Sequence, residues 1–105
     1  MKVSLLVSML TFHGIPEKDV NTLACIAVKE SNLNPKAINH RNRNGTKDYG
    51  LFQINDVNKK LCKTNSKKLL DVHNNIKCAV KVYTTQNLKA WSTYKLCKPM
   101  KVSHG

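Results

Sequence analysis

The stretch that decides the fold reads Asn44-Gly45-Thr46-Lys47-Asp48-Tyr49-Gly50-Leu51-Phe52-Gln53-Ile54-Asn55. It closes a polar segment that begins at Ala37. Asn44-Gly45 is a strong hairpin signal, because both residue types tolerate the positive φ that a type I′ turn requires. The polar faces of such a hairpin bury little apolar area. We therefore expect a small antiparallel hairpin that serves a purpose other than core packing.

Helices are predicted on both sides of this hairpin. The upstream helix is expected from about Pro16 to about Ser31, with a proline and two acids at its start, where the backbone dipole favours negative charge. Downstream, apolar residues at helical spacing predict a helix over Lys67 to Thr85, followed by a short apolar segment around Trp91. Apolar residues within the first ten positions predict a further amphipathic helix. The sequence thus predicts the α+β class, mainly helical with one small antiparallel β-hairpin sheet.

Length and composition indicate a single domain that spans residues 1–105, because the chain contains no linker, repeat or low-complexity tract. Hydrophobic residues make up 41% and charged residues 23%, which excludes a disordered or fibrous protein. Lys and Arg number 18 against 6 Asp and Glu, giving a net charge of +12. A charge this uneven favours a polyanionic partner: nucleic acid, an acidic membrane or an acidic bacterial wall.

The start of the chain predicts neither a membrane span nor a cleaved leader. The apolar run from Val3 to Leu10 is interrupted by serines and falls far short of the roughly 20 residues that cross a bilayer. Met1-Lys2 followed by an apolar run imitates a signal peptide, but no small-x-small cleavage site precedes Phe12. We therefore interpret this run as part of the folded domain.

Four cysteines, at positions 25, 62, 78 and 97, favour disulfides over a metal site. None of them has the C-x-x-C spacing of a zinc knuckle or a redox pair. Three connectivities are open, of which a bond between Cys25 and Cys97 would tie the early helix to the C-terminal region. Disulfides imply an oxidising compartment, whereas buried free thiols would place the protein in the cytosol.

Two of the six acidic residues are candidates for acid–base chemistry. Glu30 falls in the last turn of the helix predicted to end at Ser31, where the helix dipole and apolar neighbours should raise its pKa. Asp48 follows 18 residues later on the far strand of the hairpin, among Asn and Thr side chains that would keep it charged. One protonated acid beside one anion is the arrangement of glycosidases. The spacing alone also fits a solvated surface glutamate.

Three segments together resemble the active-site half of the lysozyme superfamily: Ala24-Cys25-Ile26-Ala27-Val28-Lys29-Glu30-Ser31, then Asn34-Pro35-Lys36-Ala37-Ile38-Asn39, then residues 44–55. C-type lysozymes look like this in Cys-x4-Glu-Ser and Asp-Tyr-Gly-x-x-Gln-Ile-Asn. Lytic transglycosylases resemble it in Glu-Ser-x-x-Asn-Pro-x-Ala and Gly-Leu-x-Gln-Ile-Asn. The resemblance extends from His13 to Cys97, in the c-type order of cysteines. It implies a lysozyme-like fold whose small sheet flanks the active-site cleft.

The resemblance also implies the disulfide pairing and a trimmed cleft. Cys25 would pair with Cys97, and Cys62 with Cys78, while two c-type bridges have no counterpart. Ser4 stands where the first family cysteine is expected. The stretch from Asp56 to Leu61 is much shorter than the c-type loop that carries sugar-stacking tryptophans. A shallower cleft with altered outer subsites is therefore expected.

Functional roles carried over from the resemblance fall on seven positions. Glu30 would be the general acid that protonates the glycosidic oxygen, and Asp48 the nucleophile or the electrostatic stabiliser of the oxocarbenium-like state. The substrate-binding positions would be Asn42, Gln53, Asn55, Ala90 and Trp91, with Trp91 packed on the acid. No cofactor is expected, because acid catalysis on an acetal needs only a proton donor, a charge stabiliser and a shaped cleft. No metal is expected either, since the histidines lack ligand spacing: His13, His40, His73 and His104.

The leading hypothesis is a bacteriolytic muramidase that hydrolyses the β-1,4 bond between N-acetylmuramic acid and N-acetylglucosamine in the peptidoglycan of an anionic cell wall. We expect it to be monomeric and either secreted or periplasmic. The alternative is a lytic transglycosylase of a phage or secretion system, in which the substrate's 6-hydroxyl attacks, giving a 1,6-anhydro product and leaving Asp48 no necessary role. Pro35 favours that branch, and the cysteine order favours the c-type branch.

A third hypothesis is a non-catalytic, cationic antimicrobial protein that binds walls or permeabilises membranes. Binding by charge needs neither carboxylate, so the presence of both Glu30 and Asp48 disfavours this hypothesis. A specific nucleic-acid partner is not expected, because the chain lacks an aromatic stacking platform and a recognition-helix motif.

Overall fold

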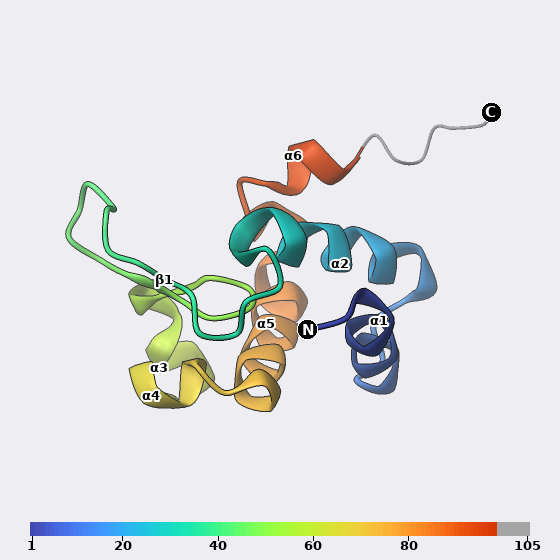
Figure 1. The fold of residues 1–105 in the computed structure, drawn as a ribbon, viewed down its shortest axis with the longest axis horizontal. Coiled ribbons are helices and arrows are strands. Elements are labelled where there is room, and N and C mark those ends of the chain that lie inside the picture. Colours follow the sequence, from blue (N-terminus) through green and yellow to red (C-terminus); the bar gives the residue numbers. More distant parts are fainter. Residues whose placement is uncertain (99–105) are drawn as a thin grey trace.

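Two long helices, α2 (Glu17–Ser31) and α5 (Val72–Gln86), organise the fold of residues 1–98, the part of the chain that the computed structural model describes. The other elements are α1 (Val3–Phe12), β1 (Ile38–Asn39), β2 (Asp48–Tyr49), β3 (Ile54–Asn55), η1 (Asp56–Asn58), α3 (Lys59–Cys62), α4 (Ser66–Leu69), η2 (Leu88–Ala90) and α6 (Tyr94–Cys97). In Figure 1, α5 lies in the middle, with α1 and α2 on one side and the sheet, α3 and α4 on the other. The predicted class, mainly helical with a small antiparallel sheet, is confirmed. Within residues 1–98, no helix combines the length and the apolar character that crossing a bilayer requires.

Helix α2 forms where the sequence predicts it. Pro16 occupies its N-cap, and Glu17 and Asp19 lie in the first turn, where negative charge is favourable. The helix ends at Ser31, and the following Asn32 adopts a left-handed conformation with a φ of 54°. Its buried face packs against α1 and α6. The last turn of α2 is therefore fixed against the core on one side while its other side faces the sheet.

The core lies mainly between α1, α2 and α5 and is cross-linked by two disulfides. Its largest fully buried apolar side chains are Leu6, Leu10, Leu23, Ile26, Leu51, Phe52, Ile54, Leu69, Ile76 and Val82. The bond between Cys25 and Cys97 joins α2 to α6 across 72 residues, and that between Cys62 and Cys78 joins α3 to α5 across 16. Both predicted pairings are confirmed. Two disulfides fit an extracytoplasmic location.

The prediction of one continuous helix over Lys67 to Thr85 is wrong. Helix α4 ends at Leu69 and α5 begins only at Val72. Between them, the Asp71 side chain accepts a hydrogen bond of 3.0 Å from the backbone N–H of Asn74 and so caps a new helix. Aspartate favours such a cap over a helix interior, and it divides the apolar pattern into two elements.

The sheet consists of three antiparallel strands in the order β1-β2-β3, each of two residues. The predicted hairpin is present as β1 and β2, and β3 adds a strand that the hairpin pattern does not predict. The register pairs Asp48 with Asn39 on one side and with Asn55 on the other. Directly paired residues point to the same face of a sheet, so this register gathers three polar side chains.

The turn of the hairpin is not the predicted type I′. The N–H of Gly45 donates a hydrogen bond of 3.0 Å to the carbonyl of Asn42, so the turn covers four residues. Gly45 has a φ of 80°, whereas Asn44 is not among the positive-φ residues of the described range. The Asn44 side-chain oxygen instead accepts hydrogen bonds from the N–H and the hydroxyl of Thr46, over 3.1 and 2.6 Å. Such side-chain bonds are an alternative to the backbone conformation that we predicted.

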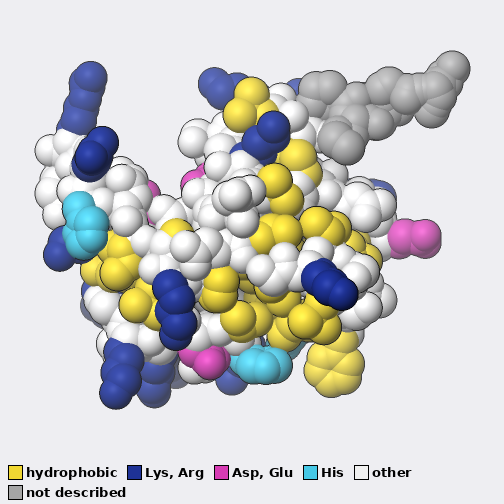
Figure 2. All heavy atoms as spheres, in the orientation of Figure 1, with side chains coloured by type: hydrophobic (Ala, Val, Ile, Leu, Met, Phe, Trp, Pro, Cys, Tyr) yellow, Lys and Arg dark blue, Asp and Glu magenta, His cyan; other side chains and the backbone are white. Residues whose placement is uncertain are grey.

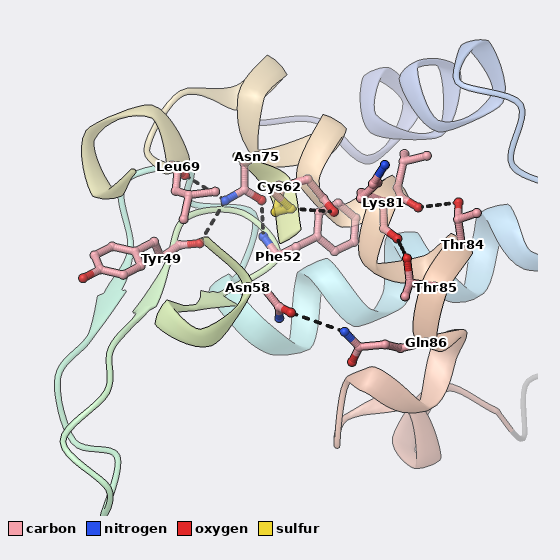
Figure 3. Close-up of a disulfide and its surroundings, with 12 residues drawn as sticks. Tyr49, Phe52, Asn58, Cys62, Leu69, Asn75, Lys81, Thr84, Thr85 and Gln86 are labelled. Atoms are coloured by element: carbon pink, nitrogen blue, oxygen red, sulfur yellow. Dashed lines mark hydrogen bonds between the residues drawn. A yellow bond between two sulfur atoms is a disulfide. The ribbon is translucent and has the colours of Figure 1, made fainter. Parts of the chain in front are cut away.

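A buried asparagine on α5 attaches the sheet region to the helices (Figure 3). The Asn75 amide donates to the carbonyls of Tyr49 and Leu69 over 2.9 and 2.7 Å, and its oxygen accepts from the N–H of Phe52 over 2.9 Å. Its side chain is fully buried. Gly50 has a φ of 76° and lies so close to this hub that a Cβ would overlap Leu69 O and the Asn75 amide. Both residues therefore fix the loop that follows β2.

Candidate active site

A cavity of about 160 Å³ lies between the helices and the sheet. We call its two sides the helical wall, formed by Glu30, Val82, Ala90, Trp91 and Ser92, and the sheet wall, formed by Asp48, Gln53, Ile54, Asn55 and Asn58. A second, more open hollow between the end of α2 and β1 shares Glu30 and Gln53 with the cavity. Figure 2 shows the surface hollowed between the hairpin and the α2 side, with acidic side chains at its edge. The cavity and the hollow thus adjoin at Glu30, and together we call them the cleft.

Glu30 lies on the helical wall because the last turn of α2 ends there, as predicted. Its side chain is half-buried, and this burial raises the pKa of the carboxyl above its ordinary value of 4.5. The Thr93 hydroxyl donates a hydrogen bond of 2.8 Å to Oε2 and lowers the pKa again in part. The negative charge of Asp48 raises the pKa of Glu30 further. Glu30 is therefore placed to hold a proton.

Trp91 closes the helical wall next to this acid. The indole is buried, and its Nε1–H donates a hydrogen bond of 2.9 Å to the carbonyl of Phe52. The rings of Trp91 and Phe52 also pack against each other, with centroids 5.8 Å apart. An indole anchored in this way presents a fixed apolar surface to the cavity and helps to exclude water from the acid.

Asp48 lies on the sheet wall in a different environment. Its Oδ2 accepts hydrogen bonds from the amides of Asn39 and Asn42, both over 3.1 Å, and its Oδ1 accepts one from Asn55 over 2.7 Å. Asn39 and Asn55 are the cross-strand partners of Asp48, so the sheet register itself brings two of the three donors. An ionised carboxylate only accepts hydrogen bonds, and three amide donors match that form.

The structure brings most of the predicted site residues together. The cavity is lined by Glu30, Asp48, Gln53, Asn55, Ala90 and Trp91. Asn42 is not part of the lining and contacts the cavity only through Asp48. The Gln53 amide donates to the carbonyls of Ala37 and Gly50 over 3.1 and 3.0 Å, so its donor group shapes the loop and is not free in the cavity.

Several residues around the two carboxyls were not expected from the sequence. Thr93 contacts Glu30 across 63 residues, and no local pattern indicates that contact. The position of Asn39 on the first strand would identify it as the neighbour of Asp48 only if the strand register were known. Asn58, Val82 and Ser92 also line the cavity without any sequence signal.

No metal site is apparent in the described range, where no three His, Cys, Asp or Glu side chains gather. Three of the histidines noted in the sequence, His13, His40 and His73, do not line the cavity. His104 lies outside residues 1–98. The chemical capacity of the cavity therefore rests on two carboxyls, an indole and several amides.

Comparison with known proteins agrees with this geometry. Residues 8–93 match a family model described as a lysozyme-like domain. The chain belongs to the lysozyme family. Lysozyme P of Drosophila melanogaster is 36% identical over 98 residues, covering 80% of this chain and 68% of the fly protein. The milk isozyme of lysozyme C from Equus caballus is 39% identical over 94 residues, covering 75% of this chain and 71% of the horse protein.

Solved lysozyme structures share the same architecture. Canine milk lysozyme superposes with a TM-score of 0.82 at 30% identity, covering 96% of this chain and 91% of the canine chain. A lysozyme from Litopenaeus vannamei superposes with a TM-score of 0.79 at 27% identity, covering 96% and 90%. The lysozyme-like fold implied by the sequence resemblance is confirmed.

Proposed function

We propose that the protein is a muramidase, which hydrolyses the β-1,4 bond between N-acetylmuramic acid and N-acetylglucosamine in peptidoglycan. The observation that carries the proposal is the pair of unlike carboxyls that line one cavity, Glu30 and Asp48. Burial favours the protonated form of the first, and three amide donors suit the ionised form of the second. The lysozymes among its relatives support the same reaction class.

In this reaction Glu30 acts first, as the general acid. Its proton passes to the glycosidic oxygen while the bond to the anomeric carbon breaks, so the leaving sugar departs as a neutral alcohol. Asp48 then faces the positive charge that develops on the sugar ring and either stabilises it or bonds to the anomeric carbon. Lysozyme is the reference case for this pairing, and these roles follow that pattern. Water completes the hydrolysis, with Glu30 taking its proton.

The surroundings of Asp48 favour hydrolysis over transglycosylation. A lytic transglycosylase needs an acid and base at Glu30 but no second carboxylate. Here the sheet register and three asparagines hold Asp48 in the lining of the cavity, as a role for this carboxylate in the reaction requires. The structure of the sheet wall therefore supports the hydrolase.

Substrate would lie along the cavity and the adjoining hollow. Asn55, Gln53, Ala90 and Trp91 line the cavity beside the carboxyls, and the hollow past Glu30 continues toward β1. The net charge of +12 draws the protein to an anionic wall. We propose that it acts as a monomer outside the cytoplasm, where the two disulfides are stable.

The test is mass spectrometry of the fragments released from purified peptidoglycan. A muramidase leaves reducing N-acetylmuramic acid ends, whereas a transglycosylase leaves 1,6-anhydro ends. The Glu30→Gln variant serves as the control, because it keeps the size of the side chain but cannot donate the proton. Anhydro ends would contradict the hydrolase. Wall clearance that is unchanged in the variant would indicate a non-catalytic binder.

A further inference from the structure

Lysines are concentrated in the segment 59–81, apart from the proposed catalytic residues. Seven of the 18 Lys and Arg residues lie in this segment, against one acid, Asp71. The lower left of Figure 2, where Figure 1 places α3 and α4, shows several Lys or Arg side chains close together. The net charge of the protein is therefore unevenly distributed, because this segment of 23 residues carries +6 of the total of +12.

Four of these lysines line one groove of about 360 Å³ beside the disulfide between Cys62 and Cys78. Lys63 follows α3, Lys68 lies on α4, and Lys77 and Lys81 lie one turn apart on α5. Figure 3 shows the disulfide close to α5, the helix that carries Lys81. The disulfide joins α3 to α5 and so fixes Lys63, which follows α3, relative to Lys77 and Lys81 on α5. The groove shares no lining residue with the catalytic cavity.

The charges in this groove are not neutralised within the described range. All four lysines are exposed, and none of them forms a salt bridge within residues 1–98. Lys59, in contrast, pairs with Asp56 over 2.6 Å. Like charges four residues apart on a helix, as at Lys77 and Lys81, destabilise it. An anion in the groove would remove this repulsion.

The lining of the groove narrows the class of anion. It contains no arginine, so recognition of an anion there rests on ammonium point charges, which is one of the ways in which proteins bind phosphate. It contains no aromatic side chain on which a nucleic-acid base could stack. None of the large exposed hydrophobic residues of the described range lines it, so it offers no anchor for a bilayer. Thr64 and Asn74 add neutral polar groups.

We propose that the groove formed by Lys63, Lys68, Lys77 and Lys81 binds a phosphodiester polymer with a polyol backbone, an acidic wall component distinct from the glycan strand. The polymer would bind through successive phosphates, without base or acyl-chain recognition. Because the groove and the cavity are separate, this binding does not depend on glycan cleavage. It would hold the protein at the wall while the cavity remains free.

The experiment compares two variants with the same charge change. One replaces Lys63, Lys68, Lys77 and Lys81 by Gln, and the matched control replaces four exposed lysines elsewhere: Lys2, Lys36, Lys89 and Lys95. Affinity for poly(glycerol phosphate) is measured by calorimetry at several salt concentrations. We expect the groove variant to lose at least about tenfold more affinity than the control. Its slope of log affinity against log salt should fall by about 3, or about 0.7 for each lost phosphate contact.

Two further measurements distinguish a specific site from binding by charge alone. Cleavage of a soluble neutral oligomer of N-acetylglucosamine should be equal in both variants, which shows that fold and cavity are intact. Equal losses of polymer affinity in the groove variant and the control would overturn the site, because charge alone would then explain binding. Single-stranded DNA bound as tightly as poly(glycerol phosphate), with the same loss in the groove variant, would overturn the choice of ligand.

Discussion

The two walls of the cleft are built by different physical means. The helical wall rests on apolar packing, on the buried Trp91 and on the disulfide between Cys25 and Cys97. The sheet wall consists of strands only two residues long, which are held by asparagine side chains around Asp48 and by the buried Asn75 behind them. One wall withdraws a carboxyl from water, and the other surrounds a carboxyl with donors. The same functional group thus lies in two environments that suit the two proposed chemical roles.

This difference also determines what a substitution on each wall should change. An apolar wall contributes to folding and raises the pKa of Glu30 by the same burial. A polar wall of short strands contributes little apolar area, so each buried polar group in it needs its hydrogen-bond partner. Substitutions on the two walls should therefore differ in their effects on activity and on the free energy of unfolding.

The largest effect is expected on the helical wall, at the acid itself. Glu30→Gln should lower kcat on peptidoglycan by about 10³-fold, the range of a lost general acid. The melting temperature should stay close to that of the parent protein, because the glutamine fills the same half-buried space. Turnover and thermal melts on the same preparation check both points. Activity within tenfold of the parent protein would remove Glu30 from the reaction.

Behind the sheet wall, the largest effect should be on folding. Asn75→Ala leaves two carbonyls and one N–H without their buried partner, and we expect a loss of about 3 kcal/mol in the free energy of unfolding. The matched control is Asn74→Ala, since the adjacent asparagine contributes its backbone N–H to a cap and should lose less than about 0.5 kcal/mol. Urea melts measure the difference. Equal stability of the two variants would contradict the assignment of Asn75 as the hub.

A smaller effect is expected from the donors to Asp48. Asn39→Ala and Asn42→Ala each remove one hydrogen bond to Oδ2, worth about 1.5 kcal/mol for a charged acceptor, or roughly a tenfold loss in kcat. Because Asn39 also donates to the Asn42 oxygen over 3.0 Å, each single variant already loses that bond, and the double variant should lose less than the sum of the two single losses. Full activity in both single variants would mean that Asp48 needs no such support.

The smallest effect concerns the hydroxyl that contacts the acid. The Thr93 hydrogen bond lowers the pKa of Glu30, so Thr93→Val should raise that pKa. The proposed role of Glu30 requires its protonated form, so activity should be lost as pH rises through its pKa. The high-pH limb of the rate profile should therefore move to higher pH in Thr93→Val and return in Thr93→Ser. An unmoved limb in the valine variant would show that Thr93 only packs.

The sequence predicts the helical wall better than the sheet wall, and the reason is physical. Helix α2 and the placement of Glu30 follow from periodicity and caps, which are local signals. The turn at residues 42–45 and the break at Asp71 depend on side-chain hydrogen bonds that compete with backbone patterns. The strand β3 depends on its pairing with β2, which the two-strand hairpin pattern does not contain. Contacts such as that of Thr93 with Glu30 join positions 63 residues apart, and only the folded chain reveals them.

The site residues also differ in how well the sequence predicts them. The two carboxyls stand out because acids are rare in this chain, and the family resemblance gives them roles. Asn39 and Asn75 carry no such signal, since asparagine is common in this sequence and is typical of turns. Their importance follows from register and burial, which a sequence read without its fold does not contain.

We infer that Glu30 holds its proton because the helical wall buries it and the charge of Asp48 faces it. The most direct measurement is an NMR titration of the Glu30 carboxyl carbon in the folded protein, repeated in Asp48→Asn. We expect a pKa above 4.5 in the parent protein, and a lower value, still raised by burial, once the facing charge is removed. A Glu30 carboxyl that titrates at or below 4.5 in the parent protein would contradict it.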